Sequence, residues 1–154
     1  MKPKRQDTTL ESEGAEFLVL GHLLIIGINA YKAYVNYPGY DLIATSTDNY
    51  KVCKIQVKSR WATNYNKGFP IKSLDSDFVA HVALNRGYSA AKKRKIVDDD
   101  LGVRPPQFYI FPTDVIQEHR REGKWNVIRI TDIPDYQKYE NNWELIKEFL
   151  NKYT

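Results

Sequence analysis

The chain has 154 residues, 42% of them hydrophobic, which is enough for one ordinary domain with a substantial core. We expect a single domain over residues 1–154, with a flexible N-terminus at residues 1–8. The 23 Lys and Arg against 19 Asp and Glu give a net charge of +4, which is compatible with a polyanionic partner but too small to establish one. The single cysteine, Cys53, excludes a disulfide framework and a cysteine-rich zinc site, and it favours a reducing cytoplasm.

The first half of the chain begins with an apolar stretch at residues 17–30, which contains His22 and is shorter than the roughly 20 residues that span a bilayer. This pattern predicts a buried core helix over about 12–26, ended by Gly27, and no membrane segment. The elements expected next are a strand at 30–35, a turn at 37–39, a strand at 40–44, a tight turn at 47–50 and a strand at 54–58.

In the second half, residues 59–76 mix cations and aromatics with Gly and Pro, which predicts a loop or lid. Residues 78–84 are apolar without alternation, as in a strand covered on both faces inside a sheet. Residues 89–106 carry a basic block and then an acidic one, which favours a solvated loop or short exposed helix, with a phosphate-contacting arm as the alternative. The remaining expected elements are a strand at 107–112, a helix at 113–122, a strand at 125–130 and a helix at 142–152.

The two strands around the tight turn bring polar side chains together. Because side chains alternate between the two faces of a strand, Gln56 and Lys58 share one face, and Cys53 shares the other with apolar neighbours. Asp48 and Asn49 suit a two-residue hairpin turn. The register set by that turn places Asp41 directly opposite Gln56, with the Cβ atoms roughly 5 Å apart.

The order of these residues resembles the PD-(D/E)xK nuclease superfamily. Glu16 lies on the first helix, Asp41 enters a strand, and Gln56-Val57-Lys58 ends the next strand. The resemblance covers roughly residues 12–60 and implies an α/β, restriction-endonuclease-like core, in which a mixed β-sheet is flanked by helices on both faces. It also implies a metal-dependent DNA endonuclease that hydrolyses phosphodiester bonds.

The resemblance implies a role for each site residue. Asp41 would be the main ligand of Mg²⁺, with Mn²⁺ as an alternative metal, because such hard cations prefer oxygen ligands. Gln56 and the Val57 backbone carbonyl would be further ligands. Lys58 would orient or help to deprotonate the attacking water, and Glu16 would support the site from the helix.

Gln56 stands where most members of the superfamily have Asp or Glu, although a subset that includes bacterial intron-encoded homing endonucleases has glutamine there. An amide binds a hard cation more weakly than a carboxylate does, so two alternatives stay open. The chain is then an inactive DNA-binding module with the same fold, or a protein-interaction domain.

DNA is the partner that the resemblance implies, and a homodimer or higher symmetric oligomer would suit an enzyme that must face two strands. Six residues are candidates for DNA contact, namely Arg60, Trp61, Lys67, Lys92, Lys93 and Arg94. The alternative for Trp61 is packing over the edge of the sheet. His22, His81 and His119 are too widely spaced to form a recognisable metal or general-base motif.

Overall fold

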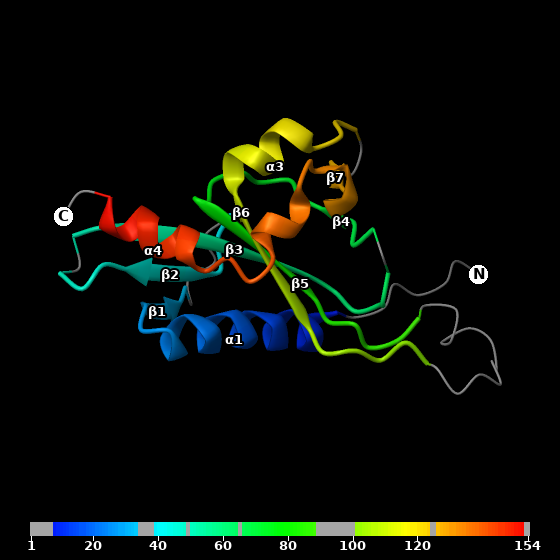
Figure 1. Ribbon diagram of the computed structural model, residues 1–154, viewed down its shortest axis with the longest axis horizontal. Helices are drawn as coiled ribbons and strands as arrows, with labels where there is room; N and C mark the ends of the chain where they lie inside the picture. Colours follow the sequence, from blue (N-terminus) through cyan, green and yellow to red (C-terminus); the bar gives the residue numbers. More distant parts are fainter. Residues whose placement is uncertain are drawn as a thin grey trace.

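The computed structural model describes residues 8–33, 39–48, 50–64, 66–88, 101–123 and 126–152. Its centre is a five-stranded sheet made of β1 (Asn29–Lys32), β2 (Leu42–Thr45), β3 (Val52–Arg60), β5 (Phe78–Ala83) and β6 (Gln107–Pro112), in the order β1-β2-β3-β5-β6 (Figure 1). A second, two-stranded sheet pairs β4 (Phe69–Pro70) with β7 (Val127–Ile128). The α-helices are α1 (Thr9–Ile25), α3 (Thr113–His119) and α4 (Glu144–Asn151), and two 3-10 helices cover Ile130–Asp132 and Tyr136–Tyr139.

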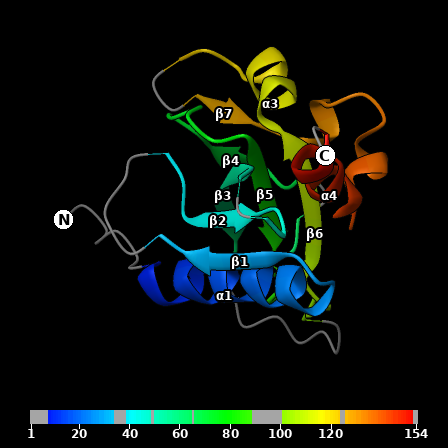
Figure 2. The same cartoon turned by 90° about the vertical axis from the view of Figure 1, so that its left-hand side faces the viewer.

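The central sheet is mixed, because β3 and β5 run parallel while the other neighbours are antiparallel. A parallel pair cannot be closed by a tight turn. The connection between β3 and β5 therefore leaves the central sheet, and β4 is part of this connection (Figure 2). All six residues of β5 are buried, as expected for an interior strand whose apolar run does not alternate.

Helices cover both faces of the central sheet. On one face, α1 and α4 form a core with the sheet, to which α1 contributes Ala15, Val19 and Leu23. On the other face, α3 and the small sheet form a second core around Tyr109 and Phe111. The predicted α/β class, with a mixed sheet flanked by helices on both faces, is confirmed (Figure 2). No helix in the described residues is long and apolar enough to cross a membrane.

The predicted hairpin register is confirmed over four residue pairs, from Leu42 opposite Ile55 to Thr45 opposite Val52. Its extension to Asp41 is wrong. The Asp41 N–H donates to the Ile55 carbonyl at 2.9 Å, so that Asp41 and Leu42 both lie opposite Ile55 as in a β-bulge. Asp41 is therefore not directly opposite Gln56. The bulge aims its side chain further along β3 instead.

Several element boundaries differ from the predictions. Helix α1 begins at Thr9 rather than near residue 12, and it ends where expected, before Gly27 at φ +87°. The predicted loop over 59–76 contains the end of β3 and all of β4. Helix α3 stops at His119, and β7 keeps only two residues of the strand predicted at 125–130.

Candidate active site at the open edge of β3

Strand β3 is longer than the strand beside it. Its pairing with β2 covers Val52–Ile55, whereas β3 continues to Arg60. Among the described residues, no strand pairs with β3 on the β2 side beyond Ile55. The backbone groups of Val57 point to that side, because the N–H and C=O of one strand residue face the same neighbour. The sheet thus leaves an open edge next to the predicted site.

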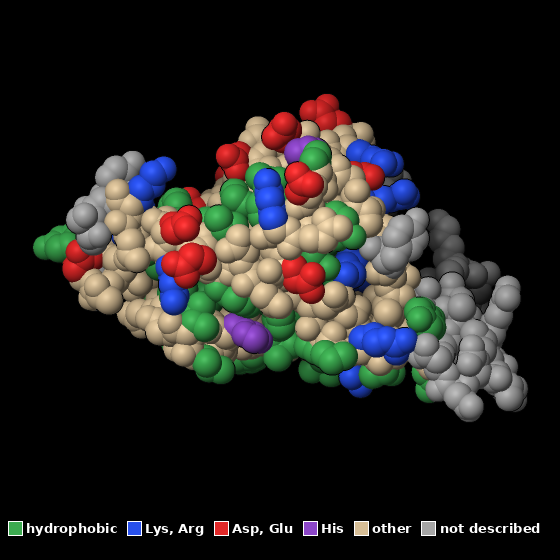
Figure 3. Space-filling view, in the orientation of Figure 1, with side chains coloured by type: hydrophobic (Ala, Val, Ile, Leu, Met, Phe, Trp, Pro, Cys, Tyr) green, Lys and Arg blue, Asp and Glu red, His purple; other side chains and the backbone are tan. Residues whose placement is uncertain are grey.

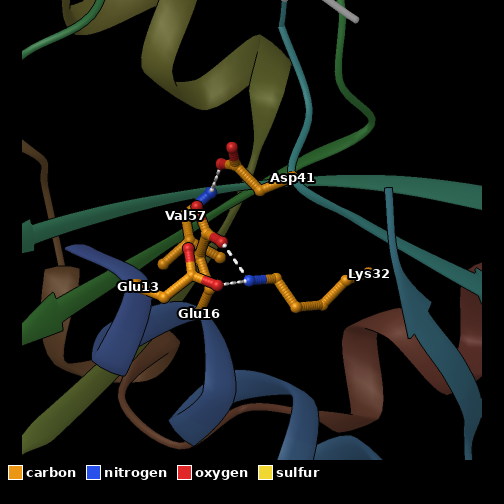
Figure 4. Close-up of polar contacts among 5 residues, drawn as sticks. All are labelled: Glu13, Glu16, Lys32, Asp41 and Val57. Atoms are coloured by element: carbon orange, nitrogen blue, oxygen red, sulfur yellow. Dashed lines mark hydrogen bonds and ion pairs between the residues drawn. The ribbon is translucent and has the colours of Figure 1, made fainter. Parts of the chain in front are cut away.

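Asp41 closes part of this edge. Its carboxylate oxygen Oδ2 accepts a hydrogen bond from the Val57 N–H at 2.7 Å, as Figure 4 shows. A hydrogen bond donated to a carboxylate is stronger than one between neutral groups, so this bond fixes the Asp41 side chain firmly. Gly39, two residues earlier, has φ +105°, and a Cβ atom there would lie 2.5 Å from Oγ of Ser73. Only glycine lets the segment that leads to Asp41 pass so close to its neighbour.

Glu16 reaches the same region from α1 but is held by a lysine that sequence reasoning missed. Lys32, on β1, forms ion pairs with Glu13 and with Oε2 of Glu16, the latter at 3.1 Å (Figure 4). The side chain of Lys32 is only 6% exposed and that of Glu16 is 19% exposed. Lys32 also lies over the ring of Phe17, 4.4 Å from its centroid. A nearly buried ammonium thus offsets one of the two negative charges of the helix carboxylates.

The electrostatic effects on the pKa values of Glu16 and Lys32 act in opposite directions. Burial raises the pKa of Glu16, the hydrogen bond from Lys32 lowers it, and the negative charge of Asp41 raises it again, with a net upward shift. Burial acts to lower the pKa of Lys32, but its bonds to Glu13 and Glu16 outweigh burial and raise it. The effect of Asp41 on Glu16 shows that the two carboxylates are near each other. Added positive charge would therefore stabilise them.

Gln56 and Lys58 lie on the other face of β3 from Val57, as predicted. Gln56 is buried, and its Oε1 atom has no hydrogen-bond partner among the described residues. Leaving a buried amide oxygen unpaired costs roughly 1–3 kcal/mol, so an unfilled acceptor here needs an explanation. Lys58 is half-buried and lies beside His81 of β5 in the parallel register.

The candidate donor atoms of the predicted site are oxygens. The carboxylates of Asp41 and Glu16 lie near the Val57 backbone (Figure 4), whereas Gln56 points to the opposite face of β3 from the Val57 side chain, and its amide oxygen has no hydrogen bond to the described residues. Oxygen-only donor sets suit Mg²⁺, which keeps several waters and needs few protein ligands. Among the described residues, no three or more His, Cys, Asp or Glu side chains gather as metal ligands would. A cation here would therefore depend on the amide and backbone oxygens as well as on the carboxylates.

The predicted DNA-contacting residues that the structure describes are engaged within the protein. The Arg60 guanidinium donates to the Gly68 carbonyl at 2.8 Å, and Trp61 lies against Gly87. The ammonium of Lys67 donates to Gln107 and to the Tyr109 hydroxyl, each at 2.7 Å, and burial lowers its pKa. Lys92, Lys93 and Arg94 lie outside the described residues. DNA contact by these six residues stays a prediction.

Lys32 could have been found from the sequence pattern. In β1, Ala30 and Lys32 are buried while Asn29 and Tyr31 are exposed, so the lysine falls on the inward face of an alternating strand. A buried lysine is almost always paired with a carboxylate. Glu13 and Glu16 lie three residues apart on the preceding helix and therefore share a side of it, which makes them the natural partners.

Replacing Lys32 by Met is expected to lower the free energy of unfolding by about 2 kcal/mol, because it leaves Glu16 buried without its counter-ion. The loss stays below that of a fully buried pair because Glu13 is 51% exposed. Urea denaturation measures the effect. Glu13→Gln is the matched control and should cost less than about 1 kcal/mol. Adding Glu16→Gln to Lys32→Met should recover stability, and no recovery would contradict the pairing.

Comparison with known proteins finds similar solved structures but no similar sequence family. No sequence family and no curated protein matches it. Among solved structures, the chain is similar to a bacterial homing endonuclease, I-Ssp6803I, with a TM-score of 0.59 and 21% sequence identity over 92% of this chain and 93% of that one. At this level of identity the similarity shows the fold alone, a mixed α/β fold like that of a homing endonuclease, and the predicted superfamily stays a prediction.

Proposed function

We propose that the protein is a metal-dependent DNA endonuclease whose active site is the open edge of β3. The observation that carries this proposal is the hydrogen bond from the Val57 N–H to the Asp41 carboxylate. It lies at the point where β2 stops pairing with β3 and β3 continues. Asp41 immediately precedes β2, and the Val57 carbonyl, the Gln56 amide and the Lys58 ammonium all belong to the adjacent strand β3. The fold that this chain shares with a homing endonuclease supports the same function.

Asp41 would be the main Mg²⁺ ligand, with the Val57 carbonyl and the Gln56 amide oxygen beside it, and Mn²⁺ could replace Mg²⁺. The unpaired, buried Oε1 of Gln56 fits such a role, because a cation would satisfy it. When bound, the metal would polarise the phosphate and make the attacking water more acidic. Lys58 would orient that water and stabilise negative charge on the phosphate. Glu16, already paired with Lys32, would support the site from α1.

DNA would be the substrate, and the net charge of +4 would help the chain to approach it. The alternative is a DNA-binding module that has lost catalysis. Gln56 favours that alternative, because an amide in place of a carboxylate removes one negative charge from the metal site. The two functions differ in whether the chain binds Mg²⁺ and cuts DNA.

Incubation of the protein with supercoiled plasmid and Mg²⁺ is expected to yield nicked or linear DNA, and EDTA should prevent cleavage. Gln56→Glu should tighten Mg²⁺ binding by about 10-fold in calorimetry, since it restores a charged oxygen ligand. Glu118→Gln, on the surface of α3, is the control and should leave Mg²⁺ binding unchanged. DNA binding without Mg²⁺ binding or cleavage, in both the wild type and Gln56→Glu, would favour the binding module.

A further inference from the structure

Helix α1 is apolar on both of its sides. Its inner side packs in the core, but its outer side also carries large hydrophobic residues, with Leu10 89% and Ile25 84% exposed. A helix that is hydrophobic all round is normally buried on all sides. Figure 3 shows the hydrophobic side chains along the lower edge of the molecule, where α1 lies in Figure 1. We call this surface the outer face of α1, and it consists of Leu10, Gly14, Phe17, Leu18, Gly21, Leu24 and Ile25.

The outer face forms one continuous strip. At 100° per residue, its seven members fall within an arc of about 120°, and no charged residue lies within that arc. A Cβ atom built on Gly14 or Gly21 would meet no atom of the described residues within 4 Å. The two glycines cost helix stability, about 1 kcal/mol each relative to alanine, without relieving a contact with any described residue. Another backbone could approach closely at these two positions.

Six of the seven members of the strip are related by symmetry about its centre. Reversing the helix about a point between Phe17 and Leu18 exchanges Leu10 with Ile25, Gly14 with Gly21, and Phe17 with Leu18, while the seventh member, Leu24, is exchanged with Glu11 beside the strip. A two-fold interface needs this property, because the same patch must be complementary to itself. The same operation places Glu11 of one copy near His22 of the other, at the rim of the strip. An acid would there face a group that can carry positive charge.

We propose that two copies of this chain associate through the outer face of α1, with the two helices antiparallel and related by a two-fold axis. The glycines let the backbones approach, while Leu10 of each copy packs on Ile25 of the other. The strip itself carries no charged residue. The nearest charges are Glu11 and Glu13 beside it and the Lys32 ammonium over the Phe17 ring, which is paired with Glu13 and Glu16. Interfacial membrane helices carry Lys and Arg beside their apolar face, whereas α1 has three glutamates and neither cation. A second copy therefore fits this face better than a lipid surface does.

The test is a charge exchange at the two ends of the strip, read out as molar mass by sedimentation across a concentration series. Leu10 and Ile25 are so exposed that replacing them leaves the monomer fold intact. Wild type is expected to form a dimer. Leu10→Lys with Ile25→Lys should weaken it by at least about 100-fold, because the antiparallel pairing sets lysine against lysine and removes four apolar side chains. Leu10→Lys with Ile25→Glu should restore much of the association.

The charge exchange also reports the direction of pairing. Parallel helices would set lysine against lysine and glutamate against glutamate in the second variant, so it would stay monomeric and contradict the antiparallel arrangement. A monomeric wild type at every concentration would overturn the proposal. So would a wild type that stays monomeric while it binds phosphatidylcholine vesicles, which would assign the face to lipid. These readouts do not depend on nuclease activity, so this proposal and the proposed function can fail separately.

Discussion

Asp41→Asn is expected to reduce the rate of DNA cleavage by at least about 1,000-fold, equivalent to about 4 kcal/mol of transition-state stabilisation. Asparagine keeps an oxygen that can accept the Val57 N–H, now bonded at 2.7 Å, so the local fold should persist. What the substitution removes is the negative charge that a hard cation requires. Single-turnover cleavage of a plasmid under saturating protein measures the effect.

Two controls separate chemistry from binding. Lys58→Gln should cause a comparable loss of cleavage, whereas Lys54→Gln, on the same face of the same strand, should cause a loss of less than about 10-fold. A cation that only attracted DNA would matter equally at either position. Equal losses for the two lysine variants would contradict a catalytic role for Lys58. Full cleavage by Asp41→Asn would contradict the site itself.

The free energy of unfolding is expected to fall as the pH drops below about 6.5, because His81 is buried. Burial, together with repulsion from Lys67 and Arg60, lowers the pKa of His81 to about 3, against a weak opposing effect of the Lys58 backbone. Above pH 6.5 the imidazole is neutral in both states and contributes nothing. Between pH 6.5 and 3 the unfolded chain takes up a proton that the folded chain does not. Stability then falls by about 1.4 kcal/mol per pH unit.

Urea denaturation at pH 7, 6 and 5 measures this effect, and the variant His81→Phe isolates it. Phenylalanine keeps an aromatic ring to stack on Phe69, whose centroid is 4.7 Å from that of His81. Neither ring nitrogen of His81 makes a hydrogen bond of normal geometry to the described residues, so the substitution removes only the attraction between the ring and the Lys58 backbone. The variant should lose less stability than wild type between pH 6.5 and 5, by about 2 kcal/mol. Parallel pH profiles for the two proteins would exclude His81 as the cause.

The sequence was sufficient to predict the framework of the fold. Alternation of polar and apolar residues located β3, and the mostly apolar run at 78–84, which does not alternate, identified an interior strand. The turn residues set the correct register between β2 and β3. These features depend on local sequence patterns, which can be recognised in a single amino-acid sequence.

The details of the site were less predictable, because they depend on contacts between distant segments. The segment that leads into the bulge at Asp41 passes close to Ser73 at Gly39, and these two residues are more than thirty positions apart in the sequence. The loss of pairing between β2 and β3 beyond Ile55 cannot be predicted from the alternation of polar and apolar residues, because alternation indicates only which face of the sheet a side chain occupies. The alternation of β1 puts Lys32 on the inward face, but which carboxylates it pairs with depends on how α1 packs against β1. The same applies to Lys67, whose bonds to Gln107 and Tyr109 cross about forty residues.

The bond from Asp41 to the Val57 N–H has a consequence for how the site tolerates change. The donor belongs to the main chain, and every amino acid except proline supplies it. The Val57 side chain points elsewhere and packs against the core under α1. Position 57 can therefore vary to suit the packing of the interior while the acid stays in place. Val57 can therefore be replaced during evolution without disturbing the side chains of Gln56 and Lys58 on either side of it.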